Sequence, residues 1–259
     1  MKIYQVKSFL RHWLLRVDEH SLHSPFFYDF YKNVIKANSN TSDYTSIEEL
    51  RNRLAQNHTA ISVADLGATS HHFASTQRTI AQVAQTSITP APWCKFVQRL
   101  LRYTRSKKVI ELGTSMGIMS LYMATDPHVQ VTTFEGNPDM VNIALTNFEF
   151  FKKQNINLVE GNIDKTLPNH LETPSKIDFV WMDANHRYEP TIRYFEALTL
   201  RMAEKGIIAI DDIYHSPEMA RAWHELRQHD LVYGSLDLFR CGILFLDPTL
   251  NKQHFTCAV

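Results

Sequence analysis

Cysteine is scarce in this sequence, and the few cysteines are spread along it. Among 259 residues there are three, Cys94, Cys241 and Cys257. An odd and scattered set matches neither a disulfide framework nor the paired spacing of a zinc cluster. We therefore expect reduced thiols and a cytoplasmic protein.

An excess of positive charge is missing as well. Lys and Arg together number 27, as do Asp and Glu, so the formal net charge is zero. The overall charge therefore does not draw the chain to a phosphate backbone or to an anionic membrane. We expect a small-molecule acceptor as the partner, with neither nucleic acid nor membrane, and leave a homodimer open.

No long apolar run marks the N-terminus as a signal peptide or a membrane span. The apolar stretches of residues 1–20 are broken by Lys7, Arg11, His12 and Arg16. The spacing predicts an amphipathic helix whose apolar face packs on the protein, with binding to a membrane surface as the alternative. Internal repeats and low-complexity segments are also absent from the sequence.

Two different patterns divide the chain. Up to about residue 105 the periodicity is helical, in segments separated by polar turns. From Lys107 onward, short apolar strands alternate with amphipathic helices, and the last two apolar stretches form a hairpin about Arg240–Gly242. This alternation is typical of parallel βαβ units in a doubly wound α/β fold. We predict a helical extension over residues 1–85 that packs on the core, followed by an α/β domain over residues 86–259.

Two stretches look like the strand-to-loop turn of a nucleotide-binding site, DLGATS at residues 65–70 and ELGTSMG at residues 111–117. The second follows an apolar strand and opens an apolar helix. Its glycines therefore lie where the backbone approaches a ligand and a helix N-terminus faces it. Gly113 and Gly117 are separated by three residues and lack the third glycine of dinucleotide-binding loops. A nicotinamide oxidoreductase is therefore disfavoured.

Residues at two further strand ends extend this candidate site. Glu135 ends the next strand, at the distance from the loop where an acidic side chain accepts hydrogen bonds from the ribose hydroxyls of an adenosine. Gly161 and Asn162 follow the third strand, where a small residue and an amide would frame an adenine ring. Asn162 by itself is more often a turn residue.

Three carboxylates follow the next two strands. Asp183 ends IDFVWMD, and Asp211 with Asp212 ends GIIAIDD. Ligands of open α/β sheets bind outside the carboxyl ends of the strands, so we expect these acids to converge. Converging carboxylates repel one another unless a cation lies between them, and a hard ion such as Mg²⁺ suits their oxygens. The alternative is that Asp211 and Asp212 cap the following helix or bind water.

The order of these motifs resembles the class I methyltransferases that use S-adenosylmethionine, over about residues 85–246. The resemblance assigns ELGTSMG to the methionine end of the cofactor, FEGNPD to the ribose and EGNI to the adenine. Within this class, the chain is most similar to the metal-dependent O-methyltransferases of the catechol and caffeoyl-CoA type. The resemblance implies a mostly parallel, seven-stranded sheet with a terminal antiparallel hairpin.

The resemblance also implies a set of functional residues. Those expected to bind the cofactor are Glu111, Gly113, Thr114, Ser115, Gly117, Glu135, Gly136, Asn137, Gly161, Asn162 and Asp183. Asp183, Asp211 and Asp212 are expected to bind Mg²⁺ or another divalent cation, with an aspartate at position 212 where relatives have an asparagine.

Asp183 and His186 are the expected catalytic residues. His186 lies three residues after Asp183, the offset at which a lysine of catechol-type enzymes removes the proton from the acceptor hydroxyl. An imidazole does the same near neutral pH. The alternative is a loop histidine that only shapes the pocket.

The expected reaction is methyl transfer from S-adenosylmethionine to a small hydroxylated molecule, such as an aromatic one, with help from a divalent cation. Two alternatives stay open: a metal-independent N- or carboxyl-methyltransferase, and a non-catalytic protein that binds the cofactor. In the segment HSLHSPFF we expect Phe26 and Phe27 to lie in the core, and we leave the roles of His20 and His23 open.

Overall fold

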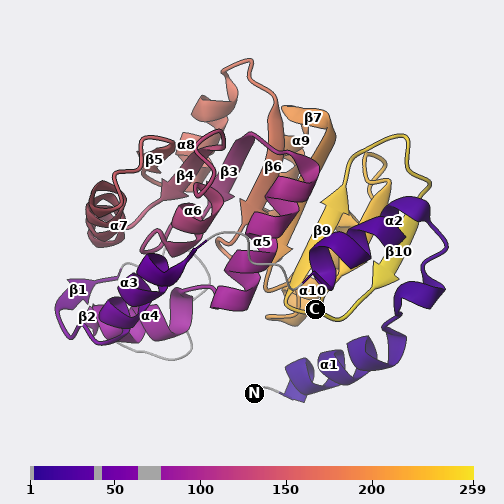
Figure 1. Ribbon diagram of the computed structural model, residues 1–259, viewed down its shortest axis with the longest axis horizontal. Coiled ribbons are helices and arrows are strands. Elements are labelled where there is room, and N and C mark those ends of the chain that lie inside the picture. Colours follow the sequence, from indigo (N-terminus) through magenta and orange to yellow (C-terminus); the bar gives the residue numbers. More distant parts are fainter. Residues whose placement is uncertain (1–2, 38–42, 64–76) are drawn as a thin grey trace. The chain divides into compact units, whose positions relative to one another are not determined.

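The protein is described by a computed structural model over residues 3–37, 43–63 and 77–259. Its elements form two compact units, Met1–Asn38 with Thr173–Val259 and Ser39–Glu172. Both units combine strands with helices (Figure 1). The glycine-containing stretch at residues 65–70 lies outside the described residues. The domain boundary predicted at residue 85 stays a prediction.

The unit of residues 39–172 is built on three parallel strands in the order β3-β4-β5. Their bounds are β3 (Lys108–Leu112), β4 (Gln130–Glu135) and β5 (Ile156–Glu160). Each strand is followed by a helix, in turn α6 (Ile118–Met123), α7 (Pro138–Phe150) and α8 (Ile163–Leu171). Because the strands are parallel, the loops that follow them leave the same edge of the sheet.

The N-terminal part of this unit is mostly helical, with α3 (Thr45–Ala55), α4 (Ile80–Ser87) and α5 (Ala91–Thr104). A short antiparallel pair, β1 (Ala60–Ser62) and β2 (Gln77–Thr79), interrupts the helices. Strands this short carry no readable alternation, so the sequence pattern did not predict them. Thr79 then begins α4 through a capping box with Gln82.

The other unit holds five strands in the order β10-β8-β9-β7-β6. Their bounds are β6 (Ile177–Met182), β7 (Met202–Asp211), β8 (Gly234–Asp237), β9 (Cys241–Phe245) and β10 (Gln253–Thr256). Strands β6 and β7 are parallel, and β9 is antiparallel to β7 and β8. The α/β class, the mostly parallel strands and the antiparallel hairpin are confirmed. Strand β10 pairs in parallel with β8 and was not predicted.

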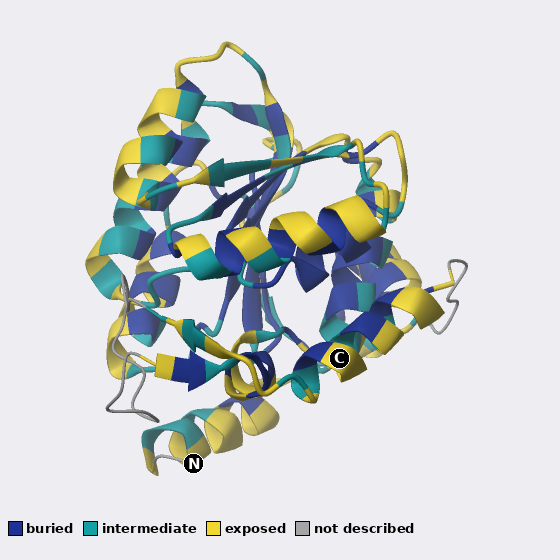
Figure 2. Cartoon of the chain, turned by 90° about the vertical axis from the view of Figure 1, so that its left-hand side faces the viewer, coloured by how far each residue is buried: buried dark blue, intermediate teal, exposed yellow. Residues whose placement is uncertain are grey.

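Two helices connect the strands of this unit, α9 (Tyr188–Thr199) and α10 (Pro217–Leu226). Ser216 begins α10, since its side chain accepts a hydrogen bond from the backbone N–H of Met219 and Pro217 follows it. This is the N-cap and N1 pair that the sequence indicates. Strand β9 is buried over its whole length. Figure 2 shows that the exposed positions, in yellow, lie mostly on helices and loops.

The N-terminal segment of this unit consists of α1 (Ile3–Leu15), η1 (Glu19–Ser21), α2 (Pro25–Phe30) and the π-helical turn η2 (Tyr31–Ile35). In Figure 1, α2 lies over β9 and β10. Phe27 packs edge-on against Phe245 and Phe255, with ring centroids 5.4 and 5.1 Å away. The core position predicted for Phe27 is confirmed, and Phe26 is half-buried.

A buried carboxylate ties α1 to its unit. Asp237, only 3% exposed, accepts hydrogen bonds from the Tyr214 hydroxyl at 2.6 Å and from Trp223 Nε1 at 3.2 Å. His12 Nε2 of α1 lies 3.4 Å from Asp237 Oδ1. A buried charge is stable only when donors surround it, so this contact fixes the face of α1 that carries His12.

Within the described residues, no helix is long and apolar enough to cross a membrane. The three cysteines, Cys94, Cys241 and Cys257, are buried free thiols. Reduced cysteines stay a prediction.

Candidate functional site

The loop between β3 and α6 has an unusual backbone. Gly113, Ser115 and Gly117 all have positive φ, at 97°, 49° and 81°. The backbone N–H groups of Gly113 and Thr114 donate to the carbonyl oxygen of Phe134 at 3.0 and 3.1 Å. A left-handed conformation costs free energy at Ser115, and it persists only where the surroundings hold it. Such clusters mark candidate ligand sites.

Two residues of helix α7 contact this loop. A Cβ atom on Gly117 would lie 2.5 Å from Phe148 Cε1, so the close packing requires glycine. Asn147 Nδ2 donates to the carbonyl oxygen of Met116 at 2.9 Å. Asn147 could not be predicted from the sequence, because a single amide within an amphipathic helix belongs to no motif.

Glu111 and Thr114 support the loop from inside the unit. The fully buried Glu111 carboxylate accepts hydrogen bonds from the hydroxyls of Ser120 and Thr133. Thr114 Oγ1 lies 2.5 Å from Thr133 Oγ1. These contacts join β3, α6 and β4 in one polar network, which rigidifies the loop.

Glu135 binds the loop directly. Its Oε2 accepts the Ser115 backbone N–H at 2.8 Å, and its Oε1 accepts the Asn137 backbone N–H at 2.9 Å. Burial raises the pKa of Glu135, while the backbone N–H groups of Asn137, Ser115 and Gly136 lower it. A carboxylate offers about four acceptor positions. At least one position therefore remains for a donor such as a ribose hydroxyl.

The hydroxyl of Ser115 has no hydrogen-bond partner among the residues that the structure describes, and its Oγ is buried. Leaving a buried hydroxyl unsatisfied costs about 1–3 kcal/mol. This atom therefore fits a site in which a polar group of a bound cofactor supplies the missing hydrogen bond.

Replacing Ser115 with alanine should separate folding stability from cofactor binding. The free protein should gain up to about 1 kcal/mol in free energy of unfolding, because a buried unsatisfied hydroxyl is removed. Binding of S-adenosylhomocysteine should weaken severalfold, because the hydroxyl no longer contacts the ligand. Urea unfolding and calorimetry measure the two effects, and a loss of stability with unchanged binding would argue against a ligand contact.

Three further predicted residues lie at strand ends. Asn137 Oδ1 caps α7 by accepting two backbone N–H groups of its first turn, and its Nδ2 donates to the Ser62 carbonyl oxygen at 3.0 Å. Asn162 caps α8, and its Oδ1 accepts the backbone N–H of Asp164 at 2.9 Å. Gly161 has φ 130° and donates its N–H to the Glu135 carbonyl oxygen at 2.8 Å. Cofactor contacts by these residues stay predictions, whereas the two capping roles are present.

A second cluster belongs to the unit of residues 1–38 and 173–259. Asp183 follows β6, and Asp211 is the last residue of β7. Asn185, His186 and Asp212 have positive φ, at 66°, 38° and 53°. These strand-end loops are thus held in conformations that such residues seldom adopt, which again marks a candidate functional site.

A guanidinium neutralises the deepest carboxylate. Arg240 Nη2 lies 2.7 Å from Asp211 Oδ2, and Asp211 is only 1% exposed. Burial raises the pKa of Asp211, and the charges of Asp183 and Asp212 add to the increase, whereas Arg240 lowers it. The sequence analysis placed Arg240 only in a hairpin turn. No sequence pattern indicates this contact: Asp211 pairs with Cys241 across β7 and β9, and the pairing brings the preceding arginine alongside.

His186 pairs with Asp183. Its Nε2 lies 3.3 Å from Asp183 Oδ1. Burial lowers the pKa of His186, but Asp183, Asp212 and Asp211 raise it, and the net pKa is about 9. His215 lies alongside, with ring centroids 5.7 Å apart. At neutral pH, His186 therefore holds a proton and forms an ion pair with Asp183.

The three aspartates fit a divalent cation poorly. In the part of the chain that the structure describes, no group of three His, Cys, Asp or Glu side chains is arranged to hold a metal ion. Arg240 contacts Asp211, and His186 contacts Asp183. Cationic side chains therefore pair with two of the three carboxylates, where the sequence pattern suggested Mg²⁺. A metal ion would have to displace the guanidinium.

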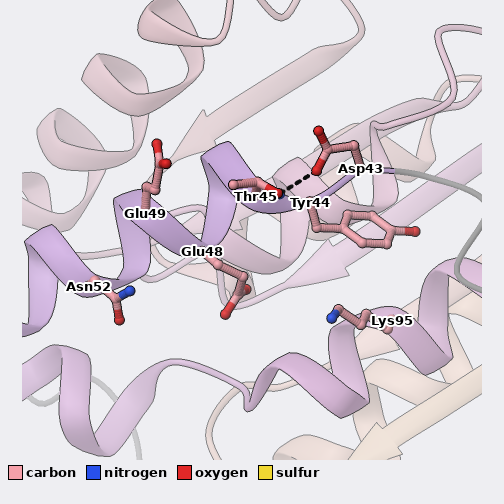
Figure 3. Close-up of a pocket in the computed structure, with 7 residues that line it drawn as sticks. All are labelled: Asp43, Tyr44, Thr45, Glu48, Glu49, Asn52 and Lys95. Atoms are coloured by element: carbon pink, nitrogen blue, oxygen red, sulfur yellow. Dashed lines mark hydrogen bonds between the residues drawn. The ribbon is translucent and has the colours of Figure 1, made fainter.

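A pocket not predicted from the sequence lies beside α3 and has a volume of ≈ 450 Å³ (Figure 3). Its lining residues are Asp43, Tyr44, Thr45, Glu48, Glu49, Asn52 and Lys95. Tyr44 stacks on Tyr122 of α6 with ring centroids 4.6 Å apart, and Glu48 accepts a hydrogen bond from the Tyr122 hydroxyl. The pocket is therefore connected to the helix that follows the glycine loop.

Residues 110–213 match a family model described as a methyltransferase domain. The match begins within β3 and ends just after β7. It therefore includes the glycine loop, Glu135 and the three aspartates.

Solved structures with a similar fold include O-methyltransferases. A putative caffeoyl-CoA O-methyltransferase from Staphylococcus aureus is 18% identical, with a TM-score of 0.60 over 85% of this chain and 97% of that chain. An O-methyltransferase from Bacillus cereus in complex with SAH is 15% identical, with a TM-score of 0.59 over 83% of this chain and 96% of that chain. At these identities the likeness concerns the fold.

A curated relative matches only a short stretch. An uncharacterized RNA methyltransferase, pc0248, from Protochlamydia amoebophila (strain UWE25) is 33% identical over 76 residues. The match spans 29% of this chain and 17% of that protein. Most of the relative's length therefore has no counterpart here.

Proposed function

We propose that this chain, whose residues 110–213 match the model of a methyltransferase domain, transfers a methyl group from S-adenosylmethionine to a hydroxyl group of a small molecule. The observation that carries the proposal is the loop between β3 and α6. Glu135 holds this loop, and the Ser115 hydroxyl is buried there without a partner in the described part of the chain. Neighbours described as O-methyltransferases favour oxygen as the acceptor atom. The balanced net charge favours a small molecule over nucleic acid.

The cofactor-binding residues belong to the unit of residues 39–172. Glu135 has an acceptor position left for a ribose hydroxyl, and Ser115 supplies a hydroxyl. Gly161 and Asn162 are assigned to the adenine. The bound cofactor supplies a methyl group on a sulfonium, which is already activated. The protein therefore mainly orients the reactants and removes one proton from the acceptor.

We assign the removal of the acceptor's hydroxyl proton to His186, with Asp183 as the residue that orients it. The acceptor oxygen forms a bond to the methyl carbon while the bond from that carbon to sulfur breaks, and the hydroxyl proton moves to a base. The unprotonated imidazole of His186, oriented by Asp183, is that base. No step is assigned to a divalent cation, because Arg240 pairs with Asp211 and His186 with Asp183.

The pH dependence of turnover should report this base. With a pKa of about 9, only a small fraction of His186 is unprotonated at neutral pH. The rate should therefore rise about tenfold per pH unit from pH 7 and level off above the pKa. Replacing His186 with glutamine should lower kcat by about a hundredfold and flatten the profile. Replacing the exposed His128 should leave kcat and the pH profile unchanged. A His186 variant with the wild-type pH profile would exclude His186 as the base.

The decisive experiment is a methyl-transfer assay with S-adenosylmethionine and a panel of hydroxylated acceptors, with and without EDTA. Turnover that EDTA does not alter supports the proposal. Turnover that stops with EDTA and returns with Mg²⁺ would show that the aspartates hold a metal despite Arg240. Methylation of amines or carboxylates alone would support the metal-independent N- or carboxyl-methyltransferase. Binding of S-adenosylhomocysteine without methylation of any acceptor would indicate a non-catalytic protein.

A further inference from the structure

Helix α1 has an apolar stripe that faces outward. At 3.6 residues per turn, five of its apolar residues fall within an arc of about 100°. They are Ile3, Val6, Leu10, Trp13 and Leu14, and their exposed fractions lie between 36% and 78%. In Figure 2, yellow marks most of this helix, beside the N-terminus. The sequence analysis expected such a face to pack on the protein.

The polar side of α1 makes the contacts with the rest of its unit. His12 is buried against Asp237, and Gln5 Nε2 donates to the His215 carbonyl oxygen at 3.5 Å. Phe9, at the border, packs edge-on against Phe239 with ring centroids 5.2 Å apart. The helix is thus anchored through the side opposite the stripe, which reverses the usual arrangement of an amphipathic helix on a globular protein.

Positive charge accompanies the stripe. Lys7 and Arg11 lie beside it on the helix, and the Arg16 guanidinium lies 5.4 Å from the centre of the Trp13 ring. The helix IYQVKSFLRHWLL contains no acidic residue. The combination of an apolar stripe, an aromatic residue of interfacial type and flanking cations is that of helices that lie in a membrane interface.

We propose that α1 binds the surface of an anionic lipid bilayer, with its apolar stripe in the boundary between headgroups and acyl chains. Lys7, Arg11 and Arg16 contact the anionic headgroups. A second copy of the chain fits the apolar stripe less well than a bilayer does, because a symmetric contact through the stripe would bring the same cations together. The binding is independent of methyl transfer, so it holds whether or not the proposed function is correct.

The test is co-sedimentation of the full chain with vesicles of phosphatidylcholine alone or of phosphatidylcholine mixed with phosphatidylglycerol. The chain should bind the mixed vesicles, and binding should weaken as salt is added. The double variant Leu10→Gln/Leu14→Gln should bind at least tenfold more weakly, because the apolar stripe is lost. The double variant Lys7→Gln/Arg11→Gln should also lose affinity, by roughly fivefold for each cation removed.

Matched controls lie elsewhere on the chain. Leu200, which is 74% exposed, and Lys205 are as accessible as the residues changed in α1. Leu200→Gln and Lys205→Gln should bind vesicles like the wild type, and thermal unfolding should show all variants folded. Absence of binding to the mixed vesicles would overturn the proposal. Equal binding to both kinds of vesicle would also overturn it. So would a dimer, detected by light scattering, that is absent in the Leu10→Gln/Leu14→Gln variant.

Discussion

Replacing Arg240 with alanine should lower the free energy of unfolding by roughly 3 kcal/mol, the scale for breaking a buried ion pair. The Asp211 carboxylate is almost fully buried, its Oδ2 accepts from Arg240, and its Oδ1 is buried without another hydrogen bond among the described residues. Without the guanidinium, the charge on Asp211 would have neither solvent nor a cation. The loss is limited, because Asp211 can take up a proton instead.

Burial and the neighbouring carboxylates already raise the pKa of Asp211 in the wild type, so the variant should show a stronger pH dependence of stability than the wild type. In the variant, the folded-state pKa of Asp211 lies above its unfolded value, so the folded state binds more protons and its stability falls as the pH rises through that range. Urea unfolding at acidic and neutral pH measures the change. Arg240→Lys keeps the cation and should lose less stability.

The same variant tests whether Arg240 takes the place of a metal ion. Removing Arg240 leaves Asp183, Asp211 and Asp212 with one cation fewer, so Mn²⁺ should stabilise the variant and leave the wild type unchanged. Arg193→Ala, which breaks an exposed ion pair with Glu189, is the matched control and should cost less than about 1 kcal/mol. Stabilisation of the wild type by Mn²⁺ would instead favour the metal site expected from the sequence.

Replacing Glu135 with alanine should weaken the binding of S-adenosylhomocysteine by at least tenfold. Two losses combine: the acceptor for the ribose, and the anchor that holds the Ser115 and Asn137 backbone N–H groups. A lost hydrogen bond to a charged group is worth about 1.5–3 kcal/mol, which corresponds to a tenfold change or more. Calorimetry measures the dissociation constant directly.

Glu160 offers a control at the equivalent position of the next strand. It pairs in register with Glu135 across β4 and β5, ends its strand in the same way and is exposed. Glu160→Ala should bind the ligand like the wild type. Glu135→Gln retains the shape and should show an intermediate loss. If Glu135→Ala and Glu160→Ala bind equally well, the cofactor does not lie at this strand end.

Local sequence patterns predicted the elements that depend on neighbouring residues. The strand that ends at Leu112, the helix that begins after Ser216 and the hairpin of β8 and β9 follow from apolar runs, caps and turns. The positions of Gly113 and Glu135 at successive strand ends follow from the same βαβ alternation. These features are set by contacts over a few residues, so the chain reveals them without a structure.

Charge pairing could not be predicted in the same way. The carboxylates of Asp183 and Asp211 suggested a metal, since the sequence shows how many acids follow the strands and does not show which cations reach them. Arg240 is separated from Asp211 by 29 positions and reaches it through the antiparallel pairing of β7 and β9. His186 reaches Asp183 because of a left-handed backbone at positions 185 and 186.

The sequence by itself determined the class of fold, the order of its strands and helices along the chain and the glycine loop with its acidic partner, because periodicity and turn chemistry are local. Only the tertiary structure decided which side chains neutralise the buried aspartates and which side of α1 faces outward. Both depend on partners distant in sequence, Arg240 for Asp211 and Asp237 for His12. A buried charge is stable only beside its partner, and the fold alone determines where that partner lies.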